Sequence, residues 1–313
     1  MTKAIFVFIS SFLLLTPVVF NAGEVSSSIQ MMCCLPFLLF LGIPHGAIDN
    51  VLYMRNNKIS NFRFITIYLV FVGLNVALWL IVPSIAYLLF LVLSAYHFGQ
   101  SQFTHYFSRQ EIPHQIFFLF WGVAVLSGMI YFNIAEIHQI MSNYEDFAVF
   151  SPLHQEQTMF VLFVISSGFT VISMLVFCWR NGLKIEQMMM EILILGLILI
   201  CFFLMPLLIG FTLYFVILHS FKVLREEYNY LNSEKIVASW AGFVKMVAPF
   251  TLMSIGGIAF LFGLIYLDVW NISYGYMLLI VISSITLPHV FVMNQFYTFL
   301  FSKGFFKYSG KGQ

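Results

Sequence analysis

Charged residues are scarce in this chain, and their scarcity decides its structural class. Only 9% of the 313 residues are charged, against roughly 25% in a soluble globular domain. Hydrophobic residues make up 61% of the chain and aromatic residues 19%, which is more apolar surface than a soluble fold of this size can bury. We therefore predict an all-α polytopic membrane helix bundle, organised as a single integral membrane domain over residues 1–313.

The chain also lacks a cysteine framework and a large net charge. Its four cysteines lie in apolar segments and form no CxxC pair, so they predict neither a disulfide scaffold nor a thiolate zinc site. A formal net charge of +1 points to neither a nucleic-acid partner nor an acidic substrate. The lipid bilayer is the partner that the composition indicates.

Long uncharged stretches predict about ten spanning helices, because one span needs about 20 apolar residues. Two of these stretches contain Pro83 and Pro206, and we divide them there because proline cannot continue a helix without losing a hydrogen bond. The predicted spans are 4–20, 31–54, 64–82, 84–107, 115–134, 158–179, 189–204, 207–225, 246–267 and 274–301.

Placing both termini in the cytoplasm puts every basic residue on the cytoplasmic side, as the positive-inside rule requires. These residues are Lys3, Arg55, Lys58, Arg63, Arg109, Arg180, Lys184, Lys222, Arg225, Lys235, Lys245, Lys303, Lys307 and Lys311. The predicted outer loops carry Glu24, Glu136, Glu145, Asp146, Glu156 and Asp268. Residues 1–23 also fit a cleaved signal peptide, which would leave nine spans and the same orientation for the rest.

Four of the eight histidines fall inside predicted spans, and these spans all run from outside to inside. They are His45, His97, His219 and His289. Ionisable groups inside a bilayer are costly and mark functional sites. At about 1.5 Å per residue, all four reach the midplane or the inner half of the membrane. They can serve as interhelical hydrogen-bonding groups or as a metal site, and an all-imidazole site suits Fe(II), Cu or Zn.

Asp49 lies four residues after His45, one helical turn further on the same face. A carboxylate there can accept the second ring N–H of a metal-bound imidazole, so we expect Asp49 to support His45. His114, His138 and His154 fall in predicted loops, where we expect them to be solvated.

Four runs of sequence carry a resemblance to a known family: GIPHGAID at 42–49, SAYHFGQ at 94–100, LHSFK at 218–222 and LPHVFV at 287–292. They resemble the Brp/Blh family of membrane-bound bacterial β-carotene 15,15′-dioxygenases, in order and spacing, from about residue 35 to 300. The resemblance implies a multi-pass enzyme of the bacterial inner membrane. It implies cleavage of the central 15,15′ double bond of β-carotene by O2, giving two molecules of all-trans-retinal.

The resemblance also implies a non-haem Fe(2+) centre, with His45 and His97 as ligands and His219 as a third. The family's third motif carries a second histidine four residues after the first, where this chain has Val223. His289 matches the family's PH near the C-terminus and is the replacement we expect. Glu226 and Glu227 are poorer candidates, because we expect them at the membrane surface.

Several aromatic residues near the histidines are candidates for a wall that holds the substrate, with ordinary helix packing as the alternative for each. They are Tyr53, Tyr96, Phe98, Phe215 and Phe291. Two other functions remain open for the whole chain: a non-catalytic carotenoid-binding protein, and a b-haem membrane protein with histidine axial ligands. A retinal-binding rhodopsin is the natural recipient of the product.

Overall fold

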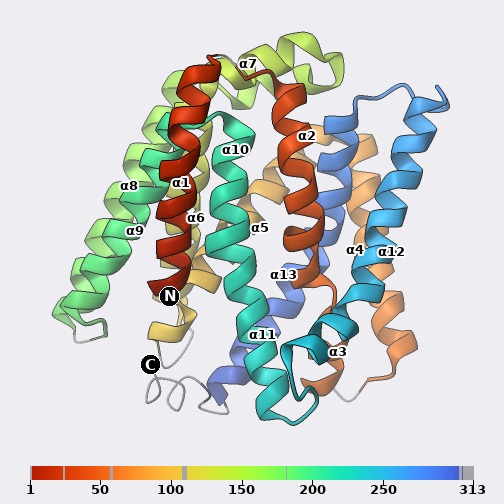
Figure 1. Ribbon diagram of the computed structural model, residues 1–313. Helices are drawn as coiled ribbons and strands as arrows, with labels where there is room; N and C mark the ends of the chain where they lie inside the picture. The colour runs from red at the N-terminus through yellow and green to blue at the C-terminus, as the bar shows by residue number, and fades with distance from the viewer. Residues whose placement is uncertain are drawn as a thin grey trace. The chain divides into compact units, whose positions relative to one another are not determined.

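The computed structural model describes residues 2–23, 25–56, 59–107, 111–180, 182–302 and 305. The described residues form helices joined by short turns, with no strand among them (Figure 1). The all-α prediction is confirmed. Of the charged residues used to orient the spans, Glu24, Lys58, Arg109, Lys303, Lys307 and Lys311 lie outside the described residues.

Two compact units make up the chain, and each is assembled from three separate stretches. The first contains Met1–Ile48, Met129–His154 and Ile194–Met277, and the second contains Asp49–Gly128, Gln155–Leu193 and Leu278–Gln313. Stretches of the two units alternate along the sequence, so no single cut separates them. The single membrane domain stays a prediction.

The first unit contains ten complete helical elements. They are α1 (Thr2–Ala22), α2 (Ser27–Phe37), the π-helix η1 (Leu38–Gly42), the 3-10 helix η2 (Ile43–Gly46), α7 (Ile134–Asn143), the 3-10 helix η4 (Glu145–Leu153), α10 (Leu207–Thr212), the π-helix η5 (Leu213–Ser220), α11 (Phe221–Ser233) and α12 (Trp240–Tyr266). In this unit α1 packs against η5, and its Phe8 and Phe12 are buried with Cys201, Met205 and Leu213 in one apolar cluster.

The second unit contains α3 (Asp49–Asn56), α4 (Asn61–Ile81), α5 (Pro83–Phe103), the 3-10 helix η3 (Thr104–Tyr106) and α8 (Glu156–Trp179). Three further helices, α6 (Ile112–Phe132), α9 (Ile185–Leu204) and α13 (Tyr274–Ser302), run from one unit into the other. Both proline breaks are confirmed: Pro83 is the first residue of α5, and Pro206 caps α10. Proline suits these positions because a helix start leaves its N–H groups unpaired in any case.

Nine helices among the described residues are long and apolar enough to cross a membrane. They are Lys3–Ala22, Ser27–Arg55, Asn61–Ile81, Ile112–Phe132, Glu156–Trp179, Ile185–Leu204, Leu207–Ser233, Trp240–Tyr266 and Tyr274–Phe301. The remaining predicted span, 84–107, corresponds to α5 and η3. This helix has 21 residues, but its second half is rich in buried polar side chains, among them His97, Gln100 and Ser101.

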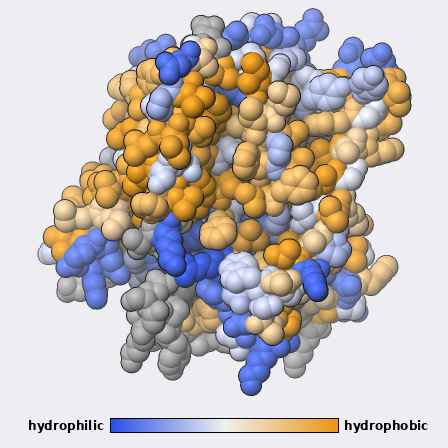
Figure 2. Space-filling model, viewed as in Figure 1, coloured by the Kyte–Doolittle hydropathy of each residue, from blue (hydrophilic) through white to orange (hydrophobic). Residues whose placement is uncertain are grey.

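Hydrophobic side chains cover much of the visible surface in the space-filling view (Figure 2). Phe6, Leu14, Leu80 and Phe203 are each more than half exposed. A water-soluble protein rarely exposes apolar residues so densely, so this surface is suited to lipid. The polytopic membrane prediction is confirmed, and the inside–outside orientation stays a prediction.

The prediction of three solvated loop histidines is wrong for His154, which is 2% exposed. Its Nδ1 lies 3.0 Å from the Phe150 carbonyl, and its own carbonyl oxygen lies 2.8 Å from His138 Nε2. Burial lowers the pKa of His154. The turns of η4 enclose the ring, an effect that hydropathy along the chain does not reveal.

Candidate metal centre and substrate groove

His45 lies where the backbone leaves regular α-helical geometry. The segment passes from the π-helix η1 into the 3-10 helix η2, which carries Pro44 and His45. Such irregular turns are frequent at functional sites. His45 is buried, its Nδ1 makes a short contact with the Gly42 carbonyl oxygen, and the Ser220 hydroxyl lies 3.4 Å from the same nitrogen.

His219 lies on a second π-helix of the same unit, η5, and packs against His45. The two imidazole centroids are 5.3 Å apart with the rings nearly perpendicular. Phe215 stacks on His219 at 5.4 Å and meets His45 edge-on at 5.6 Å. A side chain at Gly42 would meet the Phe215 ring at 3.0 Å, so glycine at this position lets the phenyl ring lie against both histidines.

The second unit contains the other two predicted histidines as a second pair. His97 on α5 and His289 on α13 have ring centroids 4.9 Å apart and nearly perpendicular planes. Both side chains are buried. Two residues 192 positions apart in the sequence therefore lie in contact. The sequence alone predicted only that their spans run in the same direction.

Asp49 supports a different histidine from the one that we predicted. Its carboxylate oxygens lie 3.0 and 3.2 Å from Nδ1 of His289. The prediction assumed continuous α-helix from His45 to Asp49, but the chain is 3-10 helix over Ile43–Gly46 and Asp49 begins the new helix α3. The change of helix type alters the direction of the carboxylate, so the i to i+4 argument fails here.

These contacts define which ring nitrogen each of two histidines presents. Nδ1 of His289 donates its proton to the Asp49 carboxylate, and Nδ1 of His45 donates to the Gly42 carbonyl. In each ring Nε2 then keeps its lone pair. Neutral imidazoles oriented by a carboxylate or carbonyl on the second nitrogen are the usual ligands of protein metal sites. The residues present fit an imidazole-bound metal ion.

Tyr68 on α4 is a supporting residue that the sequence did not reveal. Its hydroxyl donates a hydrogen bond to the Asp49 carboxylate, which in turn accepts from His289. A chain of three groups, Tyr68, Asp49 and His289, therefore fixes the orientation of one imidazole. Nothing in the local sequence of α4 marks this tyrosine, because its partner belongs to a helix that it meets only in the folded chain.

We expect Tyr68→Phe to weaken metal binding by about 10-fold or more, since outer partners of metal-bound histidines typically contribute 10–100-fold. The ring remains, so packing is conserved while the hydrogen bond to Asp49 is lost. The metal content of purified protein, titrated with a chelator, measures the change. Tyr87→Phe, on α5, is the matched control, and equal chelator resistance in the two variants would contradict the role of Tyr68.

Val223, at the position of the family's second histidine, is fully buried on α11. The side chain of Glu227 is also fully buried within the protein, and its expected depth at the membrane surface stays a prediction. Val223, Glu227 and Tyr230 recur at helical spacing and are all buried. They form the inward face of α11, whereas Glu226 is only partly buried.

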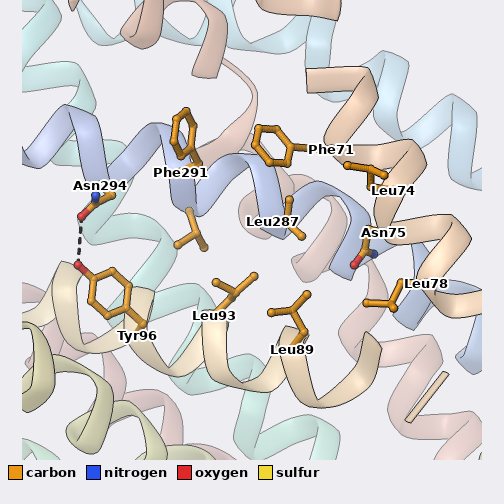
Figure 3. A pocket seen from close by; sticks show the side chains of 11 residues that line it. Phe71, Leu74, Asn75, Leu78, Leu89, Leu93, Tyr96, Leu287, Phe291 and Asn294 are labelled. Atoms are coloured by element: carbon orange, nitrogen blue, oxygen red, sulfur yellow. Dashed lines mark hydrogen bonds between the residues drawn. The ribbon is translucent and has the colours of Figure 1, made fainter. Parts of the chain in front are cut away.

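A groove of about 520 Å³ opens within the second unit, between α4, α5 and α13 (Figure 3). It is lined by Phe71, Leu74, Asn75, Leu78, Leu89, Leu93, Tyr96, Leu287, Val290, Phe291 and Asn294. Eight of these eleven side chains are apolar. Leu74 is 62% exposed and Phe291 is 41% exposed, so one side of the groove is open.

Polar side chains lie at both ends of the groove. At one end Tyr96 Oη donates to Asn294 Oδ1 at 3.0 Å, and Gln100 Nε2 donates to the same oxygen at 2.8 Å. At the other end Asn75 lies 3.0 Å from the hydroxyls of both Ser283 and Ser284. Tyr96 and Asn75 are at opposite ends of the view in Figure 3.

The five predicted lining residues therefore lie in different places. Tyr96 and Phe291 line the groove. Tyr53 lies 6.1 Å from Phe291, ring centroid to ring centroid, and lines a narrow hollow beside it. Phe98 is buried within the second unit and Phe215 packs on the histidine pair of the first.

Comparison with known proteins identifies the family of the chain. A family model described as beta-carotene 15,15′-dioxygenase matches residues 37–297, a range that contains all four histidines. A beta-carotene 15,15′-dioxygenase of an uncultured marine bacterium is 25% identical over 229 residues, which cover 66% of this chain and 73% of the relative. No solved structure matches the chain. The chain belongs to the β-carotene 15,15′-dioxygenase family, and it is a carotene dioxygenase, an oxidoreductase of the membrane.

Proposed function

We propose that the protein cleaves β-carotene at its central 15,15′ double bond with O2 and releases two molecules of all-trans-retinal. The double bond is broken, and each of the two oxygen atoms becomes the aldehyde oxygen of one product. The observation that carries the proposal is the oriented histidine pair of the second unit, with Nδ1 of His289 on Asp49, in a chain of this family.

We propose Fe(2+) as the metal, held by His45, His97, His219 and His289. Imidazole ligands suit Fe(II), and when bound it supplies the redox chemistry that lets O2 react with the polyene. The support is local: each unit contains one histidine pair, and one ring of each pair presents Nε2. His289 would then replace the ligand that the family has where this chain has Val223.

The protein's own residues have three tasks in this proposal. Asp49 and Gly42 hold two imidazoles in the tautomer that leaves Nε2 as the ligand. Phe215 packs on the rings of one pair and keeps water from them. The apolar groove of the second unit holds the substrate in surroundings without water, where reactive oxygen species have few side reactions.

The location follows from the chemistry of substrate and product. β-Carotene is apolar and partitions into the bilayer, and retinal also stays in lipid. We propose that the protein works in the bacterial inner membrane and receives its substrate laterally. Retinal released there is available to a retinal-binding rhodopsin.

We expect the protein, produced in a bacterium that accumulates β-carotene, to bleach the cells and to form retinal. Extracted pigments separated by chromatography measure both changes. Iron in a fixed ratio to purified protein, without a Soret band, separates this function from a b-haem protein. Persistent colour without retinal, in cells whose membranes contain the protein, would show that the proposed reaction is wrong.

A further inference from the structure

The groove of the second unit is an apolar passage with polar side chains at both ends. Tyr96 lines the groove and precedes His97 in the chain, while Val290 and Phe291 line it directly after His289. From Tyr96 back to Leu89 the groove follows seven residues of α5, about 10 Å at 1.5 Å per residue. The groove is therefore an extended slot between helices that also carry two predicted ligands.

The lining indicates an apolar ligand that arrives from lipid. Leucine, phenylalanine and valine make up most of the wall, and its open side is formed by exposed apolar residues such as Leu74. Cavities with apolar walls and a few placed polar groups are typical ligand sites. A water-soluble substrate would find few hydrogen-bond partners along this slot.

The Asn75 end differs from the rest because its polar groups form a cluster of their own. Asn75 turns one face of its amide towards Ser283, Ser284 and Trp79, and Trp79 Nε1 donates to the Ser283 hydroxyl at 2.6 Å. With its oxygen on these donors, the Asn75 amide is held in one orientation at the end of the groove that it lines. A polar amide is thus placed at the end of an apolar slot.

We propose that this groove binds one arm of the carotenoid, with the central double bond at the Tyr96 end and the ring at Asn75. The proposal rests on the proposed function, and it adds the position and direction of the substrate. Asn75 becomes a specificity-determining residue, since an oxygen substituent on the ring meets its amide. The central double bond then lies at the end of the groove whose Tyr96 directly precedes the predicted ligand His97 in α5.

Filling the groove tests its position. Leu93→Trp places an indole inside the slot, and Leu88→Trp places one on the 49% exposed side of the same helix. We expect Leu93→Trp to lower kcat/KM for β-carotene by about 10-fold or more, because small misplacements of a substrate cost that much. The same variant should retain less β-carotene on purification, with unchanged iron content, while Leu88→Trp behaves as the wild type.

The outcomes distinguish a failure of the proposed function from a failure of the groove assignment. If wild-type protein forms no retinal, the proposed function fails whatever the variants do. If wild-type protein forms retinal and Leu93→Trp matches Leu88→Trp in turnover and in bound β-carotene, the groove holds only lipid and the assignment of the groove fails.

Asn75→Leu tests the direction, with a carotenoid that is hydroxylated on one ring. We expect the wild type to cleave it, and Asn75→Leu to lower kcat/KM for it several-fold more than for β-carotene. Leu88→Trp, on the exposed side of α5 outside the groove, should change both substrates equally. No cleavage of the hydroxylated carotenoid by the wild type, or an equal loss for both substrates in Asn75→Leu, would overturn the placement of the ring.

Discussion

His97→Ala and His45→Ala should each abolish retinal formation and deplete the protein of iron. Partners one step removed from a metal typically contribute 10–100-fold to affinity or activity, so the loss of a ligand itself should exceed about 100-fold. Both imidazole rings are buried, and alanine removes the ring without supplying a nitrogen that could replace it as a ligand. Iron content and retinal yield from the same purified preparation measure the effect.

His114→Ala is the matched control, because His114 is not a predicted ligand and packs on Phe107 and Phe177, with ring centroids 4.1 and 5.3 Å apart. It should keep iron and activity. Stoichiometric iron in His45→Ala or His97→Ala would contradict the proposed ligand set, even if turnover were lost.

Two variants test whether His289 is a ligand and whether it replaces the histidine that the family has at position 223. We expect His289→Ala to lose iron as His97→Ala does, because its Nε2 is oriented by Asp49. Adding Val223→His to His289→Ala restores the family's ligand position on the buried face of α11. Unchanged iron in His289→Ala would remove this residue from the ligands.

Gly99→Ala should prevent α5 and α6 from packing and strongly reduce the amount of folded protein in the membrane. A Cβ at Gly99 would collide with the backbone carbonyl of Phe118, and one at Gly122 with that of Ala95. Backbone atoms cannot turn aside as a side chain can, so the helices must separate. Overpacked sites typically cost about 1–3 kcal/mol, and sometimes more. Thermal stability in detergent and membrane yield measure the loss.

Gly73→Ala on α4 provides the comparison, because no atom lies within 4 Å of a Cβ at that position. It should match the wild type or exceed it slightly, since alanine is the better helix former. Equal stability of Gly99→Ala and the wild type would show that the two helices do not need this close approach. The glycine of the His97-Phe98-Gly99 motif would then need another explanation.

Much of the fold was predictable because membrane helices are defined by local properties. Hydropathy located the spans, and Pro83 and Pro206 divided two stretches where helices end and begin. The span 84–107 was predictable from its lack of charge, but it is not apolar throughout. Its helix α5 combines a lipid-compatible first half with a polar second half, whose groups only neighbouring helices can satisfy.

The errors share one cause, which is that neighbours in space were inferred from neighbours in sequence. The pairing of Asp49 with His45 assumed α-helical spacing, whereas π and 3-10 turns occupy that segment. His154 is buried although its segment reads as a loop.

The sequence by itself determined the membrane class, the helical segments, the four intramembrane histidines and the family, since each depends on composition or on residues close together in the chain. Only the tertiary structure decided which histidine each residue supports, as with Asp49 and Tyr68 on His289, and where an apolar groove opens. These depend on the faces that α4, α5 and α13 present to one another. Long-range packing selects those faces, and a scarcity of charge, however informative about the membrane, does not encode them.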